Sequence, residues 1–263
     1  MTLIASWVGV DSKKGGNQVS SVYFASDSRF SWNSQSVYDE GMKVFCSLKY
    51  PYIFGYCGDV LFPSHAIERI IYKIDCDLLF GEDVDSFTKK IHIICDEIET
   101  SLKQYPMSIN FSILFGSRES TYDFHVGQID YHDNNLTFKE LVLPKTSDTI
   151  FVGGSGATSF NEVRNSLQSN PNNGTSRFIY HCLSKTIKDY ASPTVGGIPQ
   201  LVGLFREGPG IIFGIIEGEE RYVLGKKICF VPKCLNIQWR NCNFERVNPK
   251  TMRLIEGAQA QPF

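Results

Sequence analysis

Strand-like and helix-like segments alternate in blocks along this chain, and the order of the blocks restricts the fold more than any other sequence feature. The first block is rich in β-branched and aromatic residues, arranged in short runs that polar turns separate, which is typical of strands. A polar segment with paired glycines, residues 11–17, predicts an antiparallel hairpin between the first two runs. The strands predicted in this block cover residues 2–10, 19–25, 43–48 and 52–57.

Helical spacing follows, and the whole order then repeats. Apolar residues at steps of three and four predict one pair of helices, and a loop with the sequence Ser-Asn-Pro-Asn-Asn-Gly separates a second pair. The predicted helices cover residues 66–74, 87–102, 155–168 and 175–190. The remaining predicted strands cover residues 109–116, 122–130, 136–143, 149–152, 200–206 and 210–217.

This order predicts an α+β fold in four layers. Each helix pair can cover the outer face of one sheet, and two antiparallel sheets packed face to face bury the remaining apolar stripes. No linker or change in composition divides the 263 residues. We therefore expect one α-β-β-α domain over residues 1–217, with residues 218–263 as an extension packed on it or extending from it.

Composition and charge limit the kinds of partner that are expected. The formal net charge is −2 and no apolar run approaches the length of a membrane-spanning helix, so neither a nucleic-acid partner nor a membrane is expected. The N-terminus lacks the pattern of a signal peptide, which favours a cytoplasmic protein. The eight cysteines form no C-x-x-C pair and the five histidines are scattered, so we expect reduced thiols, no metal and no cofactor.

The second residue is the first candidate for chemistry. Thr2 stands directly before a predicted buried strand, and excision of Met1 is expected because a small second residue favours it. The product would carry a hydroxyl nucleophile and a free α-amine on one residue, so that Thr2 could act as nucleophile and general base together. The competing interpretation is that Thr2 is simply a good strand former.

Four further positions follow in a fixed order. The second predicted strand ends in Ala-Ser-Asp-Ser-Arg, which brings Asp27 and Arg29 to the end of a sheet. Lys43 opens the next predicted strand, and Gly58 lies between a strand and a helix. A glycine there lets a backbone N–H approach a ligand closely. Each signal alone is common in ordinary turns and surface ion pairs; the ordered set is specific.

This set resembles the proteasome β-subunit-like family of N-terminal nucleophile hydrolases, including the bacterial proteasome-like threonine proteases. The block Phe-Val-Gly-Gly-Ser-Gly, which contains Ser155 and Gly156, is similar to the Gly-Ser-Gly stretch of that family. Val195-Gly196-Gly197 resembles its late Ser-Gly-Gly turn. The resemblance covers residues 2–216 and implies the same four-layer sandwich.

The resemblance also implies a mechanism. Thr2 would attack a peptide carbonyl, its own α-amine would take the proton, and Gly58 N–H would hold the oxyanion. Lys43 would lower the pKa of the amine or hydroxyl, and Asp27 would hold Lys43. Ser155 would complete the network, with supporting roles for Arg29, Gly156 and Ser192. The implied partners are a peptide or unfolded protein as substrate, copies of the same chain in a ring or stacked assembly, and an ATPase or other regulator of unknown identity.

Two departures from the family pattern leave alternatives open. Met1 precedes Thr2 directly, so activity would require methionine excision. Ser192 and Val195 stand where the family has an Asp and a Ser, which weakens the network around the amine. The alternatives are a non-catalytic scaffold or binding subunit, and an amidase that acts on a small molecule. For specificity, Tyr56, Leu61 and Phe62 indicate an apolar pocket together with residues 30–31 and 42–45.

Overall fold

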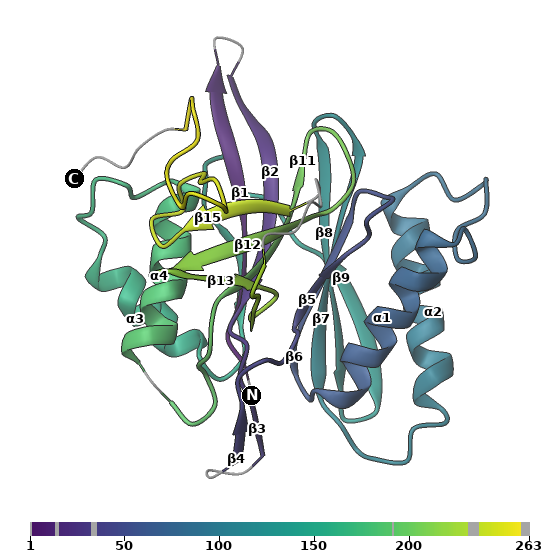
Figure 1. The fold of residues 1–263 in the computed structure, drawn as a ribbon. Coiled ribbons are helices and arrows are strands. Elements are labelled where there is room, and N and C mark those ends of the chain that lie inside the picture. Colours follow the sequence, from purple (N-terminus) through teal and green to yellow (C-terminus); the bar gives the residue numbers. More distant parts are fainter. Residues whose placement is uncertain (1, 14–15, 33–35, 191, 231–236, 259–263) are drawn as a thin grey trace.

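The protein has four layers in a computed structural model, which describes residues 2–13, 16–32, 36–190, 192–230 and 237–258. Two sheets face each other, with α3 (Ala157–Ser166) and α4 (Ser176–Asp189) outside one sheet. The helices α1 (Leu61–Asp75) and α2 (Phe87–Leu102) lie outside the other (Figure 1). The predicted fold class, α+β in an α-β-β-α sandwich, is therefore confirmed. Among the described residues, no helix is both long and apolar enough to cross a membrane.

The larger sheet has eight strands. Seven run in the order β10-β1-β2-β11-β12-β13-β14, and β15 pairs with β12 in parallel while the other pairs are antiparallel. Its first strand lies between β2 and β10, so that Ile4 is opposite Ser26 on one side and Gly153 on the other. The strands are β1 (Ile4–Lys13), β2 (Gly16–Ser26), β10 (Thr149–Gly153), β11 (Gln200–Phe205), β12 (Ile211–Glu217), β13 (Glu220–Val223), β14 (Lys226–Lys227) and β15 (Ile237–Asn241).

The second sheet is a five-stranded antiparallel meander. Its order follows the chain from β5 to β9, and a separate two-stranded hairpin, β3-β4, precedes it. These strands are β3 (Phe30–Trp32), β4 (Ser36–Tyr38), β5 (Val44–Cys46), β6 (Tyr52–Gly58), β7 (Phe111–Ser120), β8 (Asp123–His132) and β9 (Asn135–Glu140).

Apolar side chains fill three levels of the sandwich. One cluster lies between the sheets and includes Ile4, Phe24 and Leu114, all at most 1 % exposed. Two further clusters lie between a sheet and its helix pair, and α1 contributes Ile67, α2 contributes Ile94 and α4 contributes Leu183. The helical spacing seen in the sequence thus marks the faces that cover the sheets.

Two regions of the chain differ from the sequence expectation. Strand pairing continues through the predicted turn, with Ser12 opposite Asn17, because β1 and β2 extend beyond the sandwich as an exposed hairpin (Figure 1). The hairpin β3-β4 was not predicted, because its short strands are half-buried or exposed and show no apolar alternation. Beyond residue 217, β13, β14 and β15 add to the larger sheet.

Candidate functional site

Thr2 lies at the start of β1, enclosed by the turn that follows β10. The Thr2 N–H donates a hydrogen bond to Ser155 Oγ at 3.2 Å, and Gly156 N–H donates to the Thr2 carbonyl oxygen at 3.2 Å. Gly154 has φ +85°, and a Cβ there would overlap that carbonyl oxygen. Only glycine therefore fits between β10 and the Thr2 backbone. Thr2 is fully buried in the full chain; Met1, whose removal the sequence predicts, lies outside the described residues.

Asp27 follows β2 and binds four groups from different parts of the chain. Its Oδ1 accepts the Leu3 N–H at 2.9 Å and the Lys43 Nζ at 2.7 Å. Its Oδ2 accepts the N–H groups of Arg29 at 3.2 Å and Gly196 at 3.1 Å. The carboxylate is completely buried and fully hydrogen-bonded. It therefore fixes Lys43 beside the backbone that carries Thr2.

Lys43 reaches this carboxylate from the facing sheet, where it stands directly before β5. Its side chain is 0 % exposed, and Nζ lies 5.7 Å from the centre of the Phe30 ring. Burial lowers the pKa of the Lys43 amine, while the charge and hydrogen bond of Asp27 oppose this shift. The result is a desolvated ion pair that crosses the gap between the two sheets.

Gln200 also belongs to this cluster, although the sequence analysis did not identify it. Its Oε1 accepts the Lys43 backbone N–H at 2.9 Å. Its Nε2 donates to the carbonyl oxygens of Asp27 at 3.0 Å and Gly41 at 2.7 Å. The available signal was a single polar residue at the start of an otherwise apolar strand. Gln200 is fully buried and links β11 to both partners of the ion pair.

A chain of hydroxyl groups continues outward from Thr2. Ser155 Oγ lies 2.9 Å from Thr194 Oγ1, which lies 3.0 Å from Ser192 Oγ. Ser192 Oγ accepts the N–H groups of Thr194 at 3.2 Å and Val195 at 3.1 Å. Because these bonds occupy both of its acceptor positions, we infer that Ser192 donates its proton to Thr194, and that Thr194 donates to Ser155. Thr194 was not among the site residues predicted from the sequence. The side chain of Val195 lies in the apolar cluster under α4.

Arg29 holds the turn that carries Ser192. Its guanidinium makes two bonds to the Asp39 carboxylate, from Nε at 2.6 Å and from Nη2 at 2.8 Å. A third bond runs from Nη1 to the Ser192 carbonyl oxygen at 3.2 Å. Arg29 therefore helps to position the hydroxyl chain, because it binds the backbone carbonyl of Ser192.

Gly58 ends β6 beside a cavity that it helps to line. Its φ is +101°, and a Cβ there would overlap the Asn110 carbonyl oxygen, so that glycine is required. The cavity measures about 780 Å³. Its apolar lining consists of Phe30, Trp32, Val60, Leu61, Tyr105, Met107 and Ile109.

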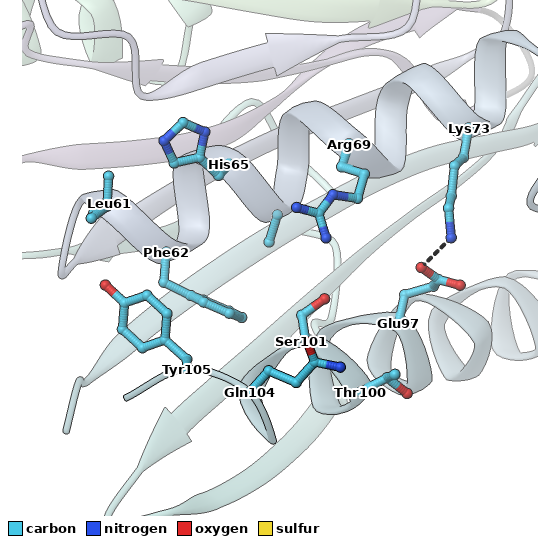
Figure 2. A pocket seen from close by; sticks show the side chains of 11 residues that line it. Leu61, Phe62, His65, Arg69, Lys73, Glu97, Thr100, Ser101, Gln104 and Tyr105 are labelled. Atoms are coloured by element: carbon cyan, nitrogen blue, oxygen red, sulfur yellow. Dashed lines mark hydrogen bonds and ion pairs between the residues drawn. The ribbon is translucent and has the colours of Figure 1, made fainter. Parts of the chain in front are cut away.

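A second cavity of about 600 Å³ lies farther out, between α1 and α2 (Figure 2). It shares Leu61, His65 and Tyr105 with the first, and the ion pair between Lys73 and Glu97 lies at its far end. The apolar pocket expected from the sequence includes Leu61. Of the other two residues expected there, Tyr56 is buried in the core under α1, and Phe62 lines the second cavity instead of the first.

The nearby thiol does not compete as a nucleophile. Burial raises the pKa of Cys57, which precedes Gly58, to about 11, so the group is protonated at neutral pH. The cysteines of the described residues are unpaired, and four of them, Cys46, Cys57, Cys95 and Cys182, are buried. Within the same part of the chain, no group of three His, Cys, Asp or Glu side chains is placed to hold a metal ion.

Comparison with known proteins finds matches among solved structures alone. No protein-family model and no curated protein sequence matches the chain. Among solved structures, Anbu (ancestral beta-subunit) from Yersinia bercovieri superimposes with a TM-score of 0.56 over 85% of this chain and 87% of that one. The chain has a proteasome-like fold. The sequence identity is 11%, so the similarity concerns the fold alone.

This comparison supports the resemblance seen in the sequence at the level of the fold. The proteasome-like fold accounts for the two facing sheets, and its N-terminal strand places Thr2 between Asp27 and Ser155. The roles of these side chains are a separate question, which depends on the geometry described above.

Proposed function

We propose that this protein is a threonine-type N-terminal nucleophile hydrolase, which cleaves peptide bonds through an acyl-enzyme on Thr2 after removal of Met1. One observation carries the proposal: the fully buried Asp27–Lys43 ion pair, 2.7 Å long, lies against the backbone of residues 2–3. A buried ion pair contributes little net stability compared with apolar residues of similar size. Its presence beside a potential N-terminal hydroxyl therefore favours a role in chemistry over a role as scaffold.

Removal of Met1 changes the Thr2 nitrogen from an amide to an amine. An amide nitrogen cannot take a proton, whereas an α-amine has a reference pKa of about 7.7–8.0 and suits a base at neutral pH. The positive charge of Lys43 disfavours a second positive charge nearby and keeps the amine in its neutral form. Thr2 Oγ then attacks the substrate carbonyl while the amine takes the hydroxyl proton.

Gly58 supplies the oxyanion donor in this proposal. A single backbone N–H at such a site is worth on the order of 3 kcal/mol to the transition state. Gly58 lines the apolar cavity, so that a substrate side chain in this cavity lies next to the carbonyl group that reacts. The tetrahedral intermediate then collapses, the peptide C–N bond breaks, and the protonated Thr2 amine gives its proton to the leaving amine. Water hydrolyses the resulting acyl-enzyme with the Thr2 amine as base, which restores the Thr2 hydroxyl.

The hydroxyl chain replaces the carboxylate that the resemblance leads one to expect near residue 192. Three neutral hydroxyls, Ser192, Thr194 and Ser155, end at the Thr2 nitrogen. They orient the amine without adding a negative charge that would favour its protonated form. Thr194 is thus a positioning residue that acts through Ser155.

We expect Thr194→Val to slow the reaction of Thr2 with a peptide epoxyketone about tenfold, because the central hydrogen bond of the chain is lost while the side-chain volume stays similar. Thr194→Ser is the matched control and keeps the wild-type rate within about twofold. The measurement is the second-order rate constant for an epoxyketone between pH 6 and 9. Equal rates for the valine variant and the wild type would show that the hydroxyl chain does not position the amine.

The substrate class follows from the cavity next to Gly58. Its aromatic and aliphatic lining favours a large apolar side chain on the residue before the cleaved bond. Fluorogenic peptides with Leu or Phe at that position are expected to be hydrolysed at least about tenfold faster than those with Asp or Lys. Hydrolysis of small amides without any peptide cleavage would favour the amidase. Complete inactivity, with no adduct on Thr2, would favour the scaffold.

Assembly belongs to the same proposal. An exposed peptidase site in the cytoplasm would endanger other proteins, so we expect copies of this chain to enclose it in a ring or stacked assembly. The Yersinia protein of similar fold is itself described as a subunit. Light scattering of the purified protein gives the size of the assembly directly.

A further inference from the structure

A third cavity lies against the first turn of α4, on a part of the protein that the proposed chemistry does not use. It measures about 370 Å³. From its lining we propose that it binds an oxyanion, the phosphate group of a small ligand. The residues that line it are Asn172, Thr175, Ser176, Arg177, Arg240, Phe244 and Arg246.

Arg240 is the central observation. The residue is only 6 % exposed, and its Nε has no hydrogen-bond partner among the described residues. Its two terminal nitrogens make only long contacts, at 3.5 Å to the Trp239 carbonyl oxygen and at 3.3 Å to Gln238 Oε1. The guanidinium lies 5.2 Å from the Phe213 ring centre and 5.3 Å from that of Phe244. A buried guanidinium with an unused donor is costly unless an acceptor occupies the cavity.

Arg240 lies near two further arginines and near Tyr23, whose effect on the Arg240 pKa opposes theirs. Burial lowers the pKa of Arg240 to about 10, and the positive charges of Arg246 and Arg177 act in the same direction. No acidic side chain is among the residues that line the cavity. A smaller cavity of about 90 Å³ shares Asn172 and Arg177 with it and also has no acidic lining residue. An anion would relieve this repulsion.

The start of α4 lines the same cavity. The helix begins at Ser176, with Thr175 as the N-cap that accepts the Phe178 N–H at 3.2 Å. Its first turn contains no acidic residue to offset the positive end of the helix dipole. The N-terminal end of a helix favours negative charge, including that of phosphate.

Phosphate fits these groups better than a halide does. Guanidinium groups bind tetrahedral oxyanions through pairs of parallel N–H donors, and a dianion offsets more than one arginine. The volume also admits a substituent on the phosphate, such as a sugar or a short chain. A carboxylate can accept some of the same hydrogen bonds, and the experiment below distinguishes carboxylate binding from phosphate binding.

The test is a titration of the full chain with inorganic phosphate, monitored by thermal unfolding and by calorimetry. Chloride at equal ionic strength is the reference, and citrate is the carboxylate arm. We expect phosphate, unlike chloride, to raise the Tm in a saturable way, because it binds the folded state. Arg246→Gln is expected to weaken phosphate binding about tenfold, and Arg240→Gln more strongly if that variant folds.

Arg253→Gln is the control, because Arg253 is an exposed arginine of the same C-terminal segment that does not line the cavity. Unchanged phosphate affinity in this control supports a localised site. The proposal fails if phosphate shifts the Tm no more than chloride, or if Arg253→Gln weakens binding as much as Arg246→Gln. Saturable binding of citrate but not of phosphate would overturn the choice of phosphate. None of these outcomes depends on Thr2 chemistry.

Discussion

Thr2→Ala is expected to lower peptide hydrolysis at least about a thousandfold, because removal of a nucleophile leaves only the binding and oxyanion contributions. The Thr2 side chain is the only part of the residue that changes. The backbone contacts to Ser155 and Gly156 persist, so the fold stays intact. The rate of cleavage of a fluorogenic peptide with an apolar residue before the bond measures this effect.

Thr2→Ser provides the matched control. Serine retains both the hydroxyl and the α-amine, so this variant is expected to keep substantial activity. Thermal unfolding of both variants shows whether a loss of rate reflects a loss of fold. Undiminished hydrolysis by a folded Thr2→Ala protein would assign the activity to another residue or to a contaminant.

Lys43→Ala is expected to lower the free energy of unfolding by about 3–5 kcal/mol, because it leaves the buried Asp27 carboxylate without its cation. Urea denaturation measures this change. Lys73→Ala is the matched control, since Lys73 pairs with Glu97 at 2.6 Å but both side chains are 33% exposed. Such a partly exposed pair is worth only about 0–1 kcal/mol.

A double variant separates stability from chemistry at this position. Lys43→Met combined with Asp27→Asn removes both charges while an amide oxygen can still accept backbone N–H groups, so this variant is expected to recover part of the lost stability. The same double variant remains inactive, because no charge then acts on the Thr2 amine. A stable and fully active double variant would show that the ion pair has no catalytic role.

The sequence was sufficient to predict the layers but not all of the strands. Helical spacing in residues 87–102 and apolar runs such as 52–57 report directly on burial, and they match α2 and β6. The hairpin β3-β4 and the short strand β14 have exposed or half-buried residues, so that no apolar pattern marks them. Their pairing depends on neighbouring strands instead of their own composition.

The residues of the candidate site also divide into those that the sequence indicates and those that it does not. Asp27 and Lys43 were predicted because each stands next to the end of a strand, and Ser155 was predicted from the resemblance of its Gly-Ser-Gly stretch. Gln200 and Thr194 were missed because neither belongs to a recognisable motif, and their roles appear only in contacts with Lys43, 157 residues from Gln200, and with Ser155, 39 residues from Thr194. Only the packing of β11 against β2 and the turn around residue 194 bring them to Thr2.

The most direct test of the account is the intact mass of the purified protein before and after treatment with a peptide epoxyketone. Stable attachment of this reagent uses both a hydroxyl and the adjacent free amine, so it reports on an N-terminal threonine. We predict a mass that lacks Met1, followed by a single adduct that maps to Thr2 and is absent from Thr2→Ala. A protein that retains Met1, or an adduct that persists in Thr2→Ala, would contradict the central claim.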